Sequence, residues 1–208
     1  MALKTTVKIS AVNNLSDARY CAGMGVELMG FQLEEYADNY IDYQNFIELT
    51  GWVSGVEFVG EFTQSSYTTI KRHITQYDFK YVQITNHDLI ESIYLEKKEI
   101  ILKFNIDIIK NSASILAIME KYKTQVRYFL FETDAGIYYK NHIVDEVLQL
   151  AQSYPILLGF NLNAENIEAL VSSHPIEGIA LRGGEEIRPG YKDFDEIADI
   201  LEALEEDD

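Results

Sequence analysis

Short apolar runs, rich in β-branched and aromatic residues, recur along the chain and alternate with amphipathic segments. Nearly continuous apolar runs of this length are typical of parallel strands that are covered on both faces. The pattern predicts strands at 7–12, 26–33, 55–62, 80–85, 99–106, 126–133, 155–162 and 177–183.

The segments between these runs carry apolar residues at helical spacing. One predicted helix follows Asn163, which we expect to be its N-cap, and another follows Asp193 for the same reason. A helix is also predicted to begin at Ser16. Further helices are predicted over 112–122 and 142–151, and a weaker helical pattern covers 87–95.

Eight strand–helix pairs in 208 residues predict an α/β fold, a single-domain (β/α)₈ TIM barrel over 1–208 with an acidic C-terminal tail at about 203–208. The alternative is an open doubly wound sheet, but no glycine fingerprint for a dinucleotide follows the first predicted strand. On a barrel, a functional site is expected at the carboxyl ends of the strands.

Composition narrows the classes of partner. The formal net charge of −17 disfavours nucleic acid and anionic lipid, because each would be repelled. No apolar run approaches the roughly 18 residues that span a bilayer, and the first predicted strand begins too early to leave room for a signal peptide. The single Cys21 and the absence of a signal favour a reducing, cytoplasmic setting. The four histidines lack metal-ligand spacing, so we expect no metal.

Several short motifs occur along the predicted strand–helix units. Their residues are Lys8, Ile9, Asp17, Ala18, Gly30, Phe31, Gln83, Pro189, Gly190, Lys192 and Asp193. These motifs resemble those of the phosphoribosylanthranilate isomerase family of tryptophan biosynthesis. That family opens with Lys-Ile-Cys-Gly, then an Asp-Ala pair, then Gly-Phe at the end of the second strand, and it has Val-Gln-Leu-His on the fourth strand and Pro-Gly-x-Lys-Asp near the end.

The resemblance implies an Amadori rearrangement of an aminoaldose, which needs a general acid and a general base but neither a metal nor another cofactor. It places the base at Ser10, where the family has cysteine, and the acid at Glu132, where the family has aspartate. A serine hydroxyl needs a neighbouring base to act; otherwise Ser10 is a small residue at a strand end. Glu132 can donate a proton if burial raises its pKa; otherwise it is a solvated or salt-bridged carboxylate.

The substrate positions implied by the resemblance are Asn39, Gln83 and Thr85. Asn39 stands where the family has an arginine for the anthranilate carboxylate, in a segment with Glu34, Glu35 and Asp38. An amide among three carboxylates is a poor site for a carboxylate ligand. Thr85 stands at the family's histidine.

The phosphate positions implied by the resemblance follow the seventh and eighth strands. Phe160 and Asn161 replace a glycine pair, and Arg182, Gly183 and Gly184 replace Ser-Ser-Gly. The two glycines permit a tight anion-binding turn to which Arg182 adds positive charge. The alternative is an ordinary turn whose arginine pairs with a neighbouring glutamate.

Three functions remain open from the sequence. The chain is an isomerase of the family type, a ligand-binding or regulatory barrel that has lost the reaction, or an enzyme for another phosphosugar with Glu132 as acid–base and Arg182 as anion clamp. The expected partner is a small phosphorylated metabolite, and the chain is expected to be a monomer or homodimer.

Overall fold

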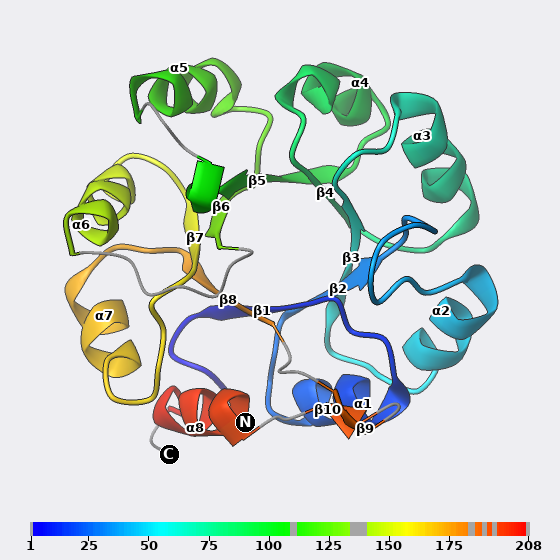
Figure 1. The fold of residues 1–208 in the computed structure, drawn as a ribbon, viewed down its shortest axis with the longest axis horizontal. Coiled ribbons are helices and arrows are strands. Elements are labelled where there is room, and N and C mark those ends of the chain that lie inside the picture. Colours follow the sequence, from blue (N-terminus) through cyan, green and yellow to red (C-terminus); the bar gives the residue numbers. More distant parts are fainter. Residues whose placement is uncertain are drawn as a thin grey trace.

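Eight parallel strands pair in chain order, and the first pairs with the last to close a barrel (Figure 1). The computed structural model describes residues 2–108, 112–133, 141–182, 186–188, 191–192 and 195–206. The barrel strands are β1 (Thr6–Ser10), β2 (Leu28–Gln32), β3 (Glu57–Phe62), β4 (Tyr81–Ile84), β5 (Glu99–Asn105), β6 (Tyr128–Glu132), β7 (Ile156–Gly159) and β8 (Gly178–Arg182). The predicted barrel is confirmed, and the open sheet is excluded.

Helices form a ring outside the barrel (Figure 1). They are α1 (Leu15–Gly23), α2 (Tyr43–Thr50), α3 (Tyr67–Gln76), α4 (Ile90–Leu95), α5 (Ser112–Tyr122), α6 (Asn141–Leu150), α7 (Ile167–Ser173) and α8 (Asp195–Ala203), with short 3₁₀ turns η1 (His87–Leu89) and η2 (Ile106–Ile108). The weakly patterned segment 87–95 is therefore helical, divided between η1 and α4.

Polar side chains set the starts of several helices. The first helix was predicted to begin at Ser16 and begins at Leu15; Asn14 caps it, with a side chain that accepts a hydrogen bond from the backbone N–H of Asp17. Asn163 accepts from the N–H of Asn166 at 2.9 Å, as a cap does, but regular helix begins only at Ile167. Asp193, the expected cap of the last helix, lies outside the described residues.

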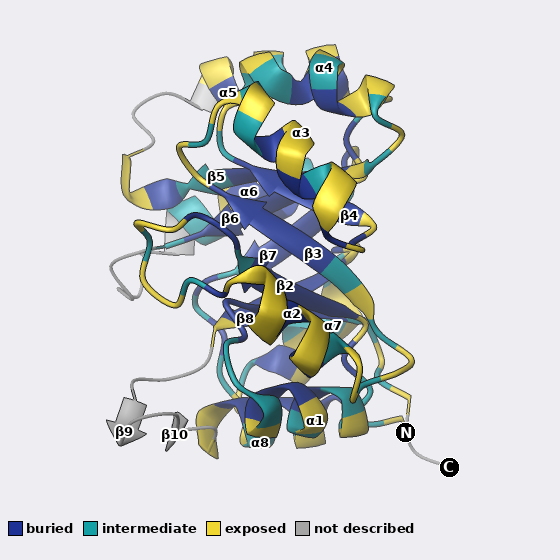
Figure 2. Cartoon of the chain, turned by 90° about the vertical axis from the view of Figure 1, so that its right-hand side faces the viewer, coloured by how far each residue is buried: buried dark blue, intermediate teal, exposed yellow. Residues whose placement is uncertain are grey.

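The strands are buried on both faces, as Figure 2 shows. A large apolar cluster fills the space between strands and helices. A separate cluster lies inside the barrel and consists of Leu28, Val59, Tyr81, Ile101, Tyr128, Leu130, Leu157 and Ala180. Because successive side chains of a strand point to opposite faces, each strand contributes to both clusters. Hence the strands show no regular alternation of polar and apolar residues in the sequence.

The two ends of the chain pack together. The N–H of Lys4 donates to the carbonyl of Leu204 at 2.9 Å, and Leu3 forms an isolated bridge with Glu205. Leu204 is fully buried, and the backbone N–H of Glu206 donates to the carbonyl of Ala2 at 3.1 Å, so the expected acidic tail is packed against the fold as far as Glu206. Between β8 and α8, β9 (Glu186–Arg188) and β10 (Tyr191–Lys192) form an antiparallel pair that the sequence did not predict. No helix in the described part of the chain is long and apolar enough to cross a membrane.

Candidate functional site

A polar layer lies above the apolar cluster inside the barrel, at the carboxyl ends of the strands. Two residues beyond the members of that cluster, the inward positions carry only polar residues or glycine. We call these positions, with Ser10 on β1, the mouth layer: Ser10, Gly30, Glu61, Gln83, Lys103, Glu132, Gly159 and Arg182. In barrels this end carries the functional site, so the layer is where chemistry is expected.

Lys8 lies two residues before Ser10 on β1, and its side chain contacts two members of the mouth layer. Its Nζ donates to Ser10 Oγ at 2.7 Å and lies 2.5 Å from Glu61 Oε1. Lys8 is fully buried, and Glu61 is 4 % exposed. The other carboxylate oxygen of Glu61 accepts from the backbone N–H of Ala11 at 3.1 Å. A buried charge requires this degree of pairing, because each ion is costly to remove from water.

Ser10 links this pair to a second one. Its hydroxyl donates to Glu132 Oε1 at 3.1 Å, while Lys103 Nζ lies 3.0 Å from Glu132 Oε2. Both of these charged side chains are about nine-tenths buried. The result is a network across four strands, in which two lysines, two glutamates and one serine contact one another.

Two glycines leave room for the two glutamates. A Cβ atom on Gly30 would overlap Glu61 Oε1 and lie 3.0 Å from Lys8 Nζ. A Cβ atom on Gly159 would lie 2.5 Å from Cγ of Glu132. Such approaches are closer than real side chains allow, so glycine at these positions is a packing requirement of the network.

The network decides the protonation state of Glu132. Burial acts to raise the pKa of its carboxyl, but the positive charges of Lys103 and Lys8, the hydrogen bond from Lys103 and the charge of Arg182 together lower that pKa to about 2. Glu132 is therefore a carboxylate near neutral pH. It accepts hydrogen bonds and carries no proton to donate. A carboxylic acid whose pKa was raised by burial alone would carry one.

One buried polar atom in the layer has no hydrogen-bond partner among the described residues. It is Oε1 of Gln83, on β4, whose side chain is buried. Gln83 pairs in register with Glu61 on one side, and it lies beside β5, which carries Lys103. Buried acceptors are nearly always satisfied, so this oxygen is a candidate contact for a ligand hydroxyl or a water.

Sequence reasoning missed three members of the network: Lys8, Glu61 and Lys103. Each places a charge inside a largely apolar strand, and all three occur at inward positions. That interruption was a usable signal, since a charged residue in a strand covered on both faces needs a buried partner. The identity of the partners could not be predicted, because Lys8 and Glu61 are 53 residues apart.

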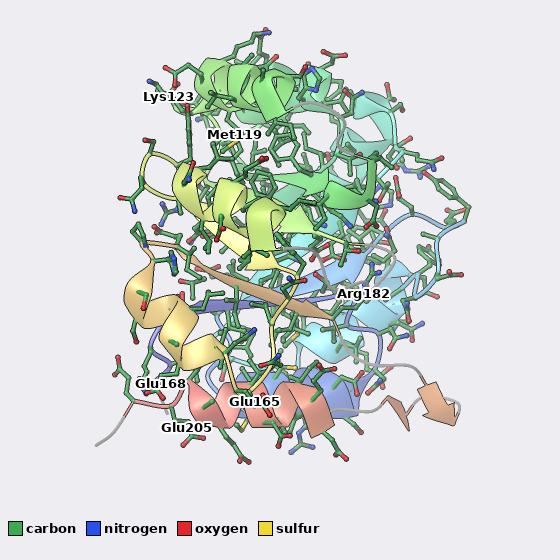
Figure 3. The ribbon with its side chains drawn as sticks, turned by 60° about the vertical axis from the view of Figure 1, so that its left-hand side comes forward. Met119, Lys123, Glu165, Glu168, Arg182 and Glu205 are labelled. Carbon is green, nitrogen blue, oxygen red and sulfur yellow. The ribbon has the colours of Figure 1, made fainter. Side chains whose placement is uncertain are left out.

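Arg182 ends β8 and pairs in register with Ser10. Its side chain is exposed, and Figure 3 shows it toward the same side as β9 and β10, away from Glu168 and Glu205. Gly183 and Gly184 lie outside the described residues. Thus the cationic member of the predicted phosphate site is at the mouth of the barrel, and the turn after it is not described.

The turn after β7 is shaped by asparagines. Asn161 adopts a φ of 55°, in the left-handed region that asparagine tolerates better than most residues. Its carbonyl accepts from Asn166 Nδ2 at 2.7 Å. Phe160 is buried, so its ring packs into the apolar core instead of covering the turn.

The segment after β2 differs from the expected group of three carboxylates. Glu34 is buried, and its carboxylate accepts the backbone N–H groups of Thr63, Gln64 and Ser65 at 2.7 to 2.9 Å. Although burial acts to raise the pKa of Glu34, the bonds from this loop outweigh it and lower the pKa. The charge of Glu34 is therefore already bound within the protein.

Asn39 and Thr85 are both held by protein groups. Asn39, at a φ of 60°, accepts from Asn13 Nδ2 at 2.8 Å, which joins the loops after β1 and β2. Thr85 Oγ1 donates to the carbonyl of Thr63 at 2.7 Å. Neither side chain joins the charged network.

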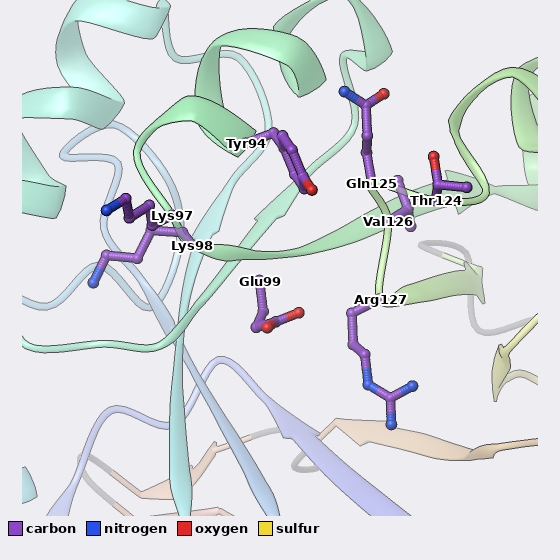
Figure 4. Close-up of a pocket in the computed structure, with 8 residues that line it drawn as sticks. All are labelled: Tyr94, Lys97, Lys98, Glu99, Thr124, Gln125, Val126 and Arg127. Carbon is purple, nitrogen blue, oxygen red and sulfur yellow. The ribbon is translucent and has the colours of Figure 1, made fainter.

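A pocket of about 520 Å³ opens at the opposite end of the barrel (Figure 4). It is lined by Glu99, which begins β5, by Arg127, which precedes β6, and by Tyr94. Because the pocket lies where β5 and β6 begin, it is separate from the mouth layer, which lies where the strands end. Functional sites of barrels occur at the ends of the strands.

Comparison with known proteins identifies the family. The model of the family described as N-(5'-phosphoribosyl)anthranilate (PRA) isomerase matches residues 7–203. The chain belongs to the phosphoribosylanthranilate isomerase family. A curated relative, N-(5'-phosphoribosyl)anthranilate isomerase of Petrotoga mobilis, is 26% identical over 206 residues, covering 95% of this chain and 96% of the relative.

Solved structures of the phosphoribosylanthranilate isomerase family have the same fold. The enzyme of Thermotoga maritima aligns with a TM-score of 0.79 at 21% identity, and that of Thermus thermophilus with 0.76 at 17%. Each alignment covers 96% of this chain and 98% of the other. At these identities the likeness establishes the fold, and the site has to be argued from its own residues.

The positions that the resemblance assigned to phosphoribosylanthranilate isomerase chemistry are brought together only in part. Ser10 and Glu132 are in direct contact, and Gln83 and Arg182 belong to the same layer. Asn39 and Thr85 are engaged with loops outside the network. Ala11, at the position of the family glycine that follows the base, adopts a φ of 54°.

Proposed function

We propose that this chain is a phosphoribosylanthranilate isomerase-like barrel that binds a small phosphorylated metabolite at its mouth and has lost the family's Amadori rearrangement. The observation that carries the proposal is the paired state of Glu132, between Ser10 and Lys103. The rearrangement needs an acid that protonates the ring oxygen. With a pKa of about 2, Glu132 holds no proton for this step near neutrality.

The state of Ser10 supports the same proposal. Its hydroxyl donates to Glu132 and accepts from the ammonium of Lys8, so both directions of hydrogen bonding are used within the protein. A serine becomes a useful base only through a neighbouring group that accepts its proton. A carboxylate with a pKa of about 2 is a very weak acceptor.

Arg182 and Gln83 support the binding half of the proposal. Arg182 places an exposed positive charge at the end of β8, where barrels commonly bind phosphate. Gln83 offers a buried oxygen without a partner among the described residues. A hydroxylated, phosphorylated metabolite would satisfy both groups.

The test combines activity with binding. Purified protein is assayed for the family rearrangement, and its gene is expressed in a tryptophan auxotroph that lacks the isomerase. We expect neither turnover nor growth, whereas calorimetric titration with ribose 5-phosphate gives saturable heat that Arg182→Gln weakens. Restored growth would overturn the loss of the reaction, and the absence of binding to sugar phosphates would overturn the ligand class.

A second candidate is an isomerase for another sugar phosphate. It is favoured by the ionised state of Glu132, which is the form that a base requires, and by Lys103, whose ammonium can polarise a carbonyl so that the neighbouring C–H proton becomes acidic enough for a weak base. Exchange of substrate hydrogen for deuterium in D₂O, followed by NMR, tests this candidate. Exchange that persists in Glu132→Gln would exclude Glu132 as the base.

A further inference from the structure

The mouth layer holds one amine that a ligand can reach. Lys103, on β5, has a side chain that is 9% exposed, whereas Lys8 is fully buried and bound to Ser10 and Glu61. Once deprotonated, the amine of Lys103 is a stronger nucleophile than the hydroxyl of Ser10, which is bound between two charged groups. Lysine amines of enzymes form imines with carbonyl substrates.

We propose that Lys103 forms an imine with the carbonyl carbon of a small phosphorylated aldehyde or ketone bound at the mouth of the barrel. The proposal rests on the ligand class proposed above and deepens it by naming the reacting group. Glu132 Oε2, 3.0 Å from Nζ, is the carboxylate that pairs with this nitrogen both before and after the reaction.

The step balances in atoms and charge. The ammonium of Lys103 releases one proton to water at the mouth of the barrel, and the freed amine attacks the carbonyl carbon, so that a C–N bond forms. The carbonyl oxygen takes up that proton and a second one from the nitrogen, and then leaves as water when the C–O bond breaks. An ammonium and a carbonyl thus become a protonated imine and one water, with a single positive charge on each side.

The electrostatics of the site favour the protonated imine. The carboxylate of Glu132 is nine-tenths buried and needs a cation beside it. Since the imine nitrogen keeps the positive charge, the ion pair survives the reaction. Lys8, held by Glu61, stays in place as the second cation near Glu132.

The surrounding residues suit a hydroxylated anionic carbonyl compound. Gln83, on the strand next to Lys103, has a buried oxygen with no partner among the described residues, and a ligand hydroxyl can donate to it. Arg182 supplies an exposed positive charge at the mouth of the barrel for a phosphate. Open-chain sugar phosphates combine these three features.

Borohydride trapping tests the proposal. The protein is incubated with dihydroxyacetone phosphate or ribose 5-phosphate, reduced with sodium borohydride, and analysed by intact mass and peptide mapping. We expect about one adduct per chain, located on Lys103, because reduction makes an imine permanent. Lys71 is the matched control, since it also pairs with a glutamate but is 53% exposed.

The variants separate the site from general lysine reactivity. Lys103→Arg should lose the adduct, and Lys71→Arg should keep it. Should Lys103→Arg fail to fold, the distribution of label in the unaltered protein still decides. Label spread over exposed lysines, in the proportions seen with urea-unfolded protein, would overturn the proposal.

Titration without borohydride separates this inference from the proposed function. Saturable binding of the same phosphates without an adduct on Lys103 overturns the imine alone. Absence of both binding and adduct overturns the ligand class as well.

Discussion

Gly30 leaves the space inside the barrel that the carboxylate of Glu61 occupies. A methyl group on Gly30 would overlap Glu61 Oε1 and approach Lys8 Nζ to 3.0 Å. Both charged groups are buried and paired, so neither can move aside without losing its partner. The ion pair between Lys8 on β1 and Glu61 on β3 therefore requires glycine at position 30 on β2.

Gly30→Ala should lower the free energy of unfolding by about 1–3 kcal/mol, the usual cost of overpacking a dense core. Gly23→Ala is the matched control, because a Cβ there meets no atom within 4 Å. Urea unfolding followed by circular dichroism measures both. Equal stability of the two variants would contradict the packing role of Gly30.

Glu61→Leu should lower the free energy of unfolding far more than the loss of one partner of an exposed ion pair. It leaves the charge of Lys8 buried and unpaired, which costs about 3–5 kcal/mol of unfolding free energy. The exposed pair of Lys80 and Glu57 provides the control, and Glu57→Gln should cost less than about 1 kcal/mol. The double change Lys8→Met, Glu61→Leu should recover most of the loss. Additive costs in this double-mutant cycle would show that the two charges do not depend on each other.

Acid should weaken the fold through Glu132. Its pKa in the folded protein is about 2, below the ordinary value of 4.5, so the unfolded chain binds more protons between these two pH values. The contribution is therefore complete above pH 4.5 and is lost as the pH falls through about 2. Urea unfolding across this range should show the unaltered protein losing stability faster than Glu132→Gln. A difference between the two proteins that is independent of pH would contradict the assigned ionisation.

Glu34→Gln should destabilise the loop after β3. The side-chain amide would turn an N–H group toward the backbone donors of Thr63, Gln64 and Ser65, so at least one charge-assisted bond is lost, at a cost of about 1–3 kcal/mol. The neighbouring Glu35 is exposed, and Glu35→Gln should change stability by less than about 0.5 kcal/mol. Hydrogen exchange at residues 63–65 should accelerate in the first variant alone.

The barrel could be predicted from the sequence because the residues that specify each strand and most helices lie within that element or next to it. The apolar runs and the capping side chain of Asn163 lie within a few residues of the structure that they specify. Ser10 and Glu132 were found through resemblance, and their direct contact was not predicted. It depends on the closure of the barrel, which brings together residues 122 positions apart.

The partners within the charged network could not be predicted from the sequence. The sequence left two states open for Glu132: a proton donor, if burial raised its pKa, or a solvated or salt-bridged carboxylate. Burial does act to raise that pKa. Lys103 and Lys8 reverse the result, and both approach from other strands. Likewise, Glu34 was counted as a free carboxylate near Asn39, although its charge is bound by the loop after β3. In both cases the deciding partners are distant along the chain.

We propose that the barrel of this family member no longer performs the family rearrangement. The most direct measurement is the rate at which purified protein converts N-(5'-phosphoribosyl)anthranilate, followed by loss of the substrate's fluorescence at neutral pH. We predict a rate indistinguishable from that of a sample without protein, because Glu132 is ionised and Ser10 is bound between Lys8 and Glu132. Turnover in the ordinary enzymatic range of about 1–10³ s⁻¹ would contradict the account.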